Sequence, residues 1–113
     1  MLYIITGDSK RSTLEILVVS GWAQYFSRVV TGDDVQMSKP HPEPFLHALS
    51  QVGLAHETVL TVEDSVAGAV ASERVGVAVV IVNTHTPAGE RWYFSSFPDF
   101  LVALRVALED DAP

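Results

Sequence analysis

Compact apolar runs alternate along this chain with segments in which apolar residues recur every three or four positions. The compact runs are short and rich in apolar and β-branched residues, which is typical of buried strands. They cover residues 2–5, 29–30, 59–62 and 77–82. The other segments have the spacing of amphipathic helices. Strands separated by single helices predict an α/β fold with a mostly parallel, Rossmann-like sheet and flanking helices.

Residues with known positional preferences mark the helix ends. Gly21, Gly53 and Gly76 follow helical segments, as C-terminal capping glycines do. Ser65 is a natural N-cap, and Pro44 fits a first helical turn because its missing N–H would have no partner there. The apolar side chains expected to face the core are Leu14, Leu17, Val18, Trp22, Phe45, Leu49, Val52, Val66, Val70, Val75, Phe100, Leu101, Leu104 and Leu108.

The chain has no linker and no low-complexity tract, so we expect one domain over its 113 residues. Residues 83–96 are predicted to form a loop, and residues 109–113 a frayed tail.

Polar residues follow three of the predicted strands. Thr6 and Gly7 follow the first, Asp33 and Asp34 the second, and Glu63 with Asp64 the third. The carboxyl ends of parallel strands meet at one edge of the sheet, where open α/β folds bind ligands. These residues are therefore expected to lie together, and Lys39 reaches the same edge from a proline-stiffened loop.

Phosphate binding is one interpretation of Thr6, Gly7 and Lys39. A hydroxyl, an unobstructed backbone N–H and a compact positive charge are groups that contact phosphate oxygens. The alternatives are an ordinary turn with a capping threonine, and a surface lysine. Taken alone, Thr6 and Gly7 favour an ordinary turn, whereas the placement of Lys39 between Ser38 and the proline-stiffened loop favours phosphate binding.

The adjacent acids Glu63 and Asp64 suit Mg²⁺, which usually takes one or two protein carboxylates and keeps several waters. The alternative is a pair of solvated acids beside a helix N-terminus, which the helix dipole favours. Asp33 and Asp34 are balanced between the same two interpretations.

The net charge of −7 disfavours nucleic acids and anionic membrane surfaces as partners. The chain has no cysteine, which excludes disulfides and thiolate sites. Its first apolar run lacks the features of a signal peptide, and no run is long enough to span a bilayer. We therefore expect a cytoplasmic protein.

In sequence the chain resembles the C-terminal half of a haloacid dehalogenase (HAD) superfamily hydrolase, in the branch of β-phosphoglucomutase and phosphoglycolate phosphatase. The resemblance covers residues 2–84 and rests on residues 4–7, 30–35, 38–42 and 62–68. It implies phosphate binding by Thr6 or Gly7, a catalytic phosphate-binding Lys39, and Mg²⁺ held by Glu63 and Asp64. The implied substrate is a small phosphorylated metabolite.

The family's first motif, a strand ending in Asp-x-Asp-Gly, does not occur in these residues, and neither does the usual cap domain. The first aspartate of that motif is the nucleophile, and its strand lies at the centre of the sheet, between those equivalent to residues 2–5 and 59–62. Asp8, Asp33 and Asp34 are weak substitutes because each follows a different strand.

Two hypotheses follow. The chain is part of a Mg²⁺-dependent HAD-like phosphatase or phosphomutase. Alternatively, it is a non-catalytic half-domain that binds phosphate or metal, or that associates with itself or a partner through exposed strand edges. A phosphoacceptor receiver domain fits less well, because its lysine follows the acidic residues, whereas Lys39 precedes them.

Overall fold

The computed structural model describes residues 1–53, 55–83 and 91–110. The elements follow the predicted alternation of strands and helices. They are β1 (Tyr3–Ile5), α1 (Lys10–Ser20), β2 (Arg28–Val30), α2 (Glu43–Val52), β3 (Leu60–Glu63), α3 (Val66–Arg74), β4 (Ala78–Ile81), β5 (Trp92–Tyr93) and α4 (Phe97–Asp110), with short 3₁₀ turns at Ala23–Tyr25 and His56–Thr58.

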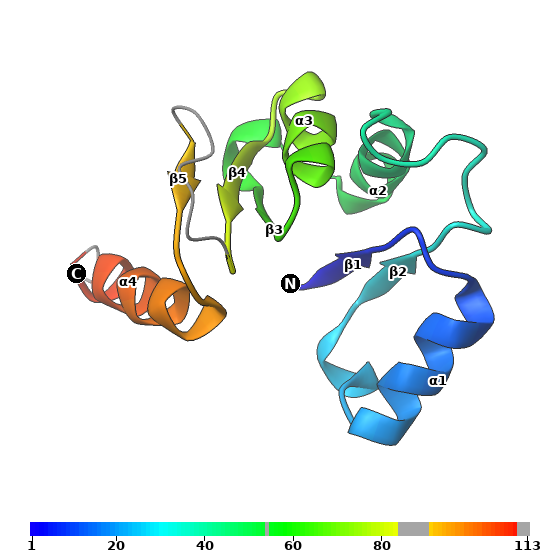
Figure 1. The fold of residues 1–113 in the computed structure, drawn as a ribbon, viewed down its shortest axis with the longest axis horizontal. Coiled ribbons are helices and arrows are strands. Elements are labelled where there is room, and N and C mark those ends of the chain that lie inside the picture. The colour runs from blue at the N-terminus through cyan, green and yellow to red at the C-terminus, as the bar shows by residue number, and fades with distance from the viewer. Residues whose placement is uncertain (54, 84–90, 111–113) are drawn as a thin grey trace.

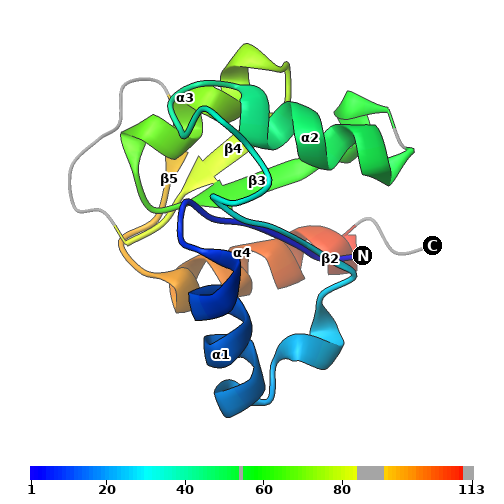
Figure 2. The same cartoon turned by 90° about the vertical axis from the view of Figure 1, so that its right-hand side faces the viewer.

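Every strand pair is parallel, but the strands form two separate ladders. One has the order β1-β2 and the other the order β3-β4-β5. β1 and β3 are neighbours in space without being hydrogen-bonded to each other (Figures 1 and 2). The fold is therefore the predicted mostly parallel α/β fold, and its sheet is divided at the position where the missing central strand was expected.

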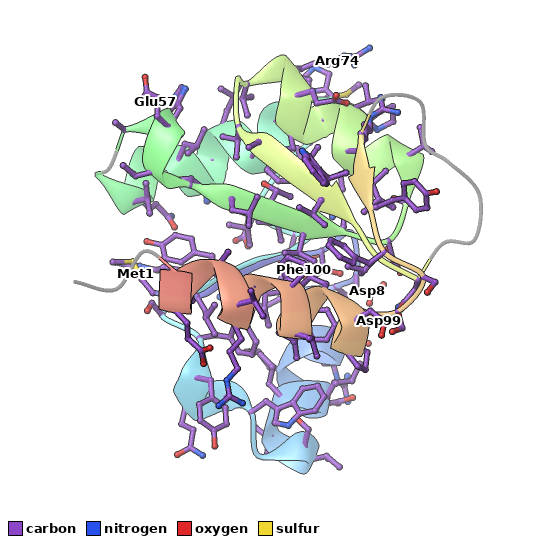
Figure 3. All side chains as sticks on the ribbon, turned by 90° about the vertical axis from the view of Figure 1, so that its left-hand side faces the viewer. Met1, Asp8, Glu57, Arg74, Asp99 and Phe100 are labelled. Atoms are coloured by element: carbon purple, nitrogen blue, oxygen red, sulfur yellow. The ribbon has the colours of Figure 1, made fainter. Side chains whose placement is uncertain are left out.

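Helices cover both faces of the strands. α2 and α3 lie on one face, and α1 and α4 lie on the other (Figure 2). Phe45 of α2 packs with Ala71, Val75 and Val77 beneath the first pair of helices. Phe100 points from α4 towards the sheet and packs with Val80 and Val82 (Figure 3). Each half of the sheet thus has its own small core.

Local sequence signals explain the helix boundaries. The Ser65 hydroxyl accepts a hydrogen bond from the backbone N–H of Gly68, as an N-cap does. Pro44 lies in the first turn of α2. Gly21, Gly53 and Gly76 all have positive φ angles, which glycine adopts without steric penalty. The predicted caps are confirmed, and α3 ends at Arg74, two residues before Gly76.

Six side chains predicted to face the core are exposed instead, and the local packing explains three of them. Trp22 is 58% exposed because the left-handed Gly21 reverses the chain before it, so Trp22 leaves the helical face. Leu101 and Leu108 are also exposed, because α4 packs on β4 through the adjacent stripe of Phe100 and Leu104.

Further apolar side chains expected in the core are exposed as well, namely Leu14, Val18 and Val66.

The predicted loop over residues 83–96 contains one element that the sequence pattern missed, the two-residue strand β5. Residues 84–90 of that loop lie outside the described residues. The predicted frayed tail is helical through Asp110, and residues 111–113 also lie outside the described part. Among the described residues, no helix is long and apolar enough to cross a membrane.

Candidate active site

Two Thr-Gly-Asp turns, after β1 and after β2, pack against each other at the carboxyl edge of the strands. The backbone N–H of Gly32 donates to the Asp8 carbonyl oxygen at 2.8 Å. A Cβ on Gly32 would lie 2.5 Å from the Gly7 carbonyl oxygen. Only a residue without a side chain permits this approach, which aligns the two strand ends.

The acids of the second turn are used within the loop. Asp33 Oδ2 accepts the backbone N–H of Lys10 at 2.8 Å, and so holds the start of α1. Asp34 Oδ2 accepts the backbone N–H of Thr31 at 2.8 Å and the Thr31 hydroxyl at 3.1 Å. The Thr31 N–H is the main cause that lowers the pKa of Asp34, with the Thr31 hydroxyl adding to it and burial opposing it. This arrangement favours a structural role for both carboxylates.

The first turn presents polar groups to solvent. The Thr6 hydroxyl accepts the backbone N–H of Asp8 at 3.2 Å, which leaves the Thr6 O–H able to donate. A Cβ placed on Gly7 would have no neighbour within 4 Å. Thr6, Gly7, Gly32, Ser38 and Lys39 line a hollow of about 140 Å³.

The loop from β2 to α2 positions Lys39. Glu43 accepts the backbone N–H groups of Gln36 and Met37, both at 2.9 Å. These two bonds, the Gln36 bond first, lower the pKa of Glu43 against an opposing effect of burial. Arg74 Nη1 of α3 donates to the Pro40 carbonyl oxygen at 3.0 Å, so the loop is tied to helices on both sides.

The Lys39 ammonium joins the two halves of the sheet. Its Nζ donates to the Ile5 carbonyl oxygen at 2.9 Å and to Glu63 Oε1 at 2.7 Å. Nζ also lies 5.7 Å from the centroid of the Phe45 ring, a cation–π contact. The side chains of Lys39 and Glu63 are only 19% and 10% exposed, so this ion pair is partly shielded from water.

Glu63 and Asp64 differ in their surroundings. The other carboxylate oxygen of Glu63, Oε2, lies where a Cβ on residue 68 would be, so Gly68 makes room for it. Asp64 follows at the turn into α3 and is exposed. In the described part of the chain no three His, Asp or Glu residues are grouped as a metal site.

The predicted site residues therefore occupy one region. Thr6, Gly7 and Lys39 share the hollow, Glu63 is bonded to Lys39, and Asp64 is the next residue in the chain. The sequence pattern did not single out Gly32 or Ser38. Two features of the sequence could have identified them: Gly32 lies in the second of the two Thr-Gly-Asp segments, and Ser38 directly precedes Lys39.

The family model of haloacid dehalogenase-like hydrolases matches residues 1–82, which is most of the chain. The protein belongs to this family. Among its HAD relatives, a phosphoglycolate phosphatase of Nitrosococcus oceani is 33% identical over 79 residues, which are 70% of this chain and 35% of that protein. The pyrophosphatase PpaX of Bacillus pumilus is 37% identical over 106 residues, or 89% of this chain and 46% of that protein.

Solved HAD structures match the fold. The crystal structure of a HAD-superfamily hydrolase, subfamily IA, from Geobacter sulfurreducens superposes with a TM-score of 0.77 at 31% identity. The match covers 91% of this chain and 51% of that one. This chain therefore spans between about a third and a half of the length of the HAD proteins that it resembles.

Proposed function

We propose that the hollow lined by Thr6, Gly7 and Lys39 binds the phosphoryl group of a small phosphorylated metabolite, as part of a HAD-type phosphatase or phosphomutase site. The observation that carries this proposal is the position of Lys39. Its ammonium is held at the carboxyl ends of β1 and β3, beside the exposed turn of Thr6 and Gly7.

The chemistry of these groups fits a phosphoryl group. An ammonium has three donors, and Lys39 uses two of them within the described part of the chain, which leaves one for a phosphate oxygen. The Thr6 O–H and the Gly7 N–H are further donors, and a Cβ on Gly7 would have no neighbour within 4 Å, so the space beside this turn is open. Lys39 is the proposed catalytic residue, because a positive charge stabilises the charge that develops on a transferring phosphoryl group.

Magnesium is proposed as the cofactor, held by Asp64 and Glu63. Asp64 is exposed and Glu63 keeps one oxygen that is not bonded to Lys39, so these two residues fit Mg²⁺, which completes its shell with water and phosphate oxygens. When bound, the ion would neutralise charge on phosphate oxygens.

Covalent phosphoryl transfer needs a nucleophile that these residues do not supply. The sequence contains no Asp-x-Asp, and the carboxylates of Asp33 and Asp34 accept backbone N–H groups in the loop. We therefore infer that residues 1–113 bind phosphate without turning over an ester. The alternative is that binding is the whole function, in a non-catalytic half-domain. The cytoplasmic location stays a prediction from the sequence.

Binding of inorganic phosphate, measured by isothermal titration calorimetry with and without Mg²⁺, tests the proposal. Lys39→Met should weaken binding by about tenfold or more, because one charge-assisted hydrogen bond is lost. Arg105→Met is the matched control. It removes one cation, whose side chain is 82% exposed, from a surface ion pair on α4 and should leave binding unchanged. Equal effects of the two substitutions would contradict the phosphate site.

Lys39→Met also leaves Glu63 without its partner, so a second variant is needed. Thr6→Val keeps the shape of the side chain and removes only the hydroxyl, and it should weaken phosphate binding while the circular dichroism spectrum is unchanged. Asp64→Asn should abolish any increase in phosphate affinity caused by Mg²⁺.

For catalysis, the chain with Mg²⁺ should show negligible turnover of p-nitrophenyl phosphate. Robust turnover that Asp64→Ala abolishes would show that a nucleophile is present.

A further inference from the structure

The carboxylate of Glu43 binds the loop before it instead of capping its own helix. Glu43 is the first residue of α2, and the N-cap residue Pro42 makes no side-chain capping bond. Glu43 Oε1 accepts the backbone N–H of Gln36, and Oε2 accepts that of Met37, both at 2.9 Å. Each carboxylate oxygen therefore holds one of two consecutive peptide groups, and bonds to an ionised acceptor are among the strongest hydrogen bonds.

These bonds close residues 36–43 into a ring that contains Lys39. The Glu43 carboxylate binds the chain just before Lys39, and the Glu43 N–H donates to His41 Nδ1, just after it, at 3.1 Å. Within the ring, the His41 N–H donates to the Ser38 carbonyl oxygen at 3.0 Å. Glu43 thus fixes the chain on both sides of Lys39.

The position of Lys39 is exacting because one ammonium contacts both halves of the sheet. Its Nζ lies 2.9 Å from the Ile5 carbonyl oxygen and 2.7 Å from Glu63 Oε1. A lysine stem is flexible, so the backbone of Lys39 has to be held if Nζ is to stay in place. The same loop lines the hollow through Gln36, Ser38 and Lys39. Movement of the loop would therefore displace both the ammonium and this wall of the hollow.

We infer that Glu43 is a positioning residue, which holds the loop so that Lys39 binds a phosphoryl group. This role rests on the proposed phosphate site, and it adds a residue outside the segments that carry the family resemblance. The charge of Glu43 acts in the opposite direction, because a carboxylate near an anion site repels phosphate, and the neighbouring Pro44 lines the hollow. Positioning and charge therefore predict opposite effects when the carboxylate is replaced by an amide.

The test measures binding of inorganic phosphate to the whole 113-residue chain at pH 7 by amide chemical shifts in NMR titrations. Glu43→Gln keeps the size of the side chain, but its amide offers one oxygen to two N–H groups and turns a donor towards the other. The dissociation constant for phosphate should rise about tenfold, because the loop then spends less time in the binding geometry.

Glu57→Gln is the charge-matched control. Glu57 is exposed and lies before the start of β3, whereas Lys39 is bonded to Glu63 at the other end of that strand. Its replacement removes the same charge and should leave the dissociation constant unchanged.

A double variant shows whether Glu43 acts through Lys39. Adding Glu43→Gln to Lys39→Met should weaken phosphate binding no further than Lys39→Met alone, because two residues that act through one contact are not additive. A carboxylate that served only the stability of the fold would instead lower the free energy of unfolding in urea and leave the dissociation constant of Glu43→Gln unchanged.

Hydrogen exchange in the unsubstituted protein tests the same coupling and does not depend on how a variant folds. If phosphate binds only while Glu43 holds the loop, phosphate at ten times its dissociation constant should slow exchange of the Gln36 and Met37 N–H groups about tenfold. The N–H of Gly21, which donates to the Val18 carbonyl oxygen at the end of α1, is the internal control and should be unaffected.

Equal or tighter phosphate binding by Glu43→Gln would overturn the positioning role and leave the proposed phosphate site standing. Exchange of the Gln36 and Met37 N–H groups that phosphate does not slow would have the same consequence. Multiplied effects in the double variant would also overturn it, since Glu43 would then act without Lys39. Failure of the unsubstituted protein to bind phosphate would instead overturn the proposed function itself, so the two failures are distinguishable.

Discussion

Lys39 shows how one side chain can serve both structure and chemistry. It neutralises Glu63 in a partly buried pair, and removing either partner leaves the other charge poorly solvated, a loss of about 1–3 kcal/mol. Gly68 contributes by leaving the space that the Glu63 carboxylate occupies. The same pair fixes the ammonium at the edge where the phosphoryl group is proposed to bind, so substitutions here alter stability and binding together.

The carboxylates of Asp34 and Glu43 lead to a prediction at low pH. Hydrogen bonds from backbone N–H groups, of Thr31 for Asp34 and of Gln36 for Glu43, lower the pKa of each. A carboxyl with a depressed folded-state pKa contributes stability above its unfolded pKa of about 4 and loses it as the pH falls through the folded value. The free energy of unfolding should therefore drop from pH 5 to pH 3 in urea titrations.

The double variant Asp34→Asn, Glu43→Gln should be less stable at pH 7. Its free energy of unfolding should also decrease less between pH 5 and pH 3 than that of the unsubstituted protein. Glu15→Gln is the control, since the interaction that Glu15 makes is an exposed ion pair with Arg11. An unchanged pH dependence in the double variant would contradict the role of these two carboxylates.

At the scale of elements, the two Thr-Gly-Asp turns act as one unit. The turn after β1 and the turn after β2 are held together by the Gly32–Asp8 backbone bond, and Asp33 links the second turn to the start of α1. The likeness of the two turns in sequence thus reflects their contact in space.

Gly32→Ala should destabilise the protein by about 1–3 kcal/mol, because the added Cβ meets the Gly7 backbone, which cannot move without shifting β1. Gly7→Ala is the matched control from the same unit. Its Cβ has no neighbour within 4 Å, and its effect on stability should be within about 0.5 kcal/mol. Urea unfolding of both variants measures the difference. Equal free energies of unfolding for the two variants would show that the turns after β1 and β2 can move apart at little cost.

At the scale of the whole molecule, the division of the sheet is the main feature. The cores around Phe45 and Phe100 are small and separate, and Leu60, Val62 and Leu2 stay exposed between them. α1 and α4 lie on the same side of the strands (Figure 1), and both helices carry exposed apolar side chains.

Amide hydrogen exchange should detect the division directly. The N–H groups of Ile5 and Val62 point into the gap between β1 and β3 and should exchange faster than those of Thr6 and Glu63, which point towards β2 and β4. Neighbouring residues in one strand serve as internal controls for each other. Equal protection of Ile5 and Thr6 would mean that the β1 edge is already covered in solution.

The sequence by itself determined the class of fold, the order of elements, the caps and the group of polar strand ends. These features depend on local periodicity and on residues such as Ser65 and Gly21, whose preferences are set by their own backbone. The HAD resemblance also named Thr6, Lys39, Glu63 and Asp64, which do lie in one region.

Only the tertiary structure decided which of these groups touch. It paired Lys39 with both Ile5 and Glu63, and assigned Asp33 and Asp34 to the loop. It also left Trp22 and Leu101 exposed, since burial depends on what an element packs against and not on its own periodicity. The unpaired edges of β1 and β3 are likewise a tertiary feature, because such edges exist only once the neighbouring strands have been placed.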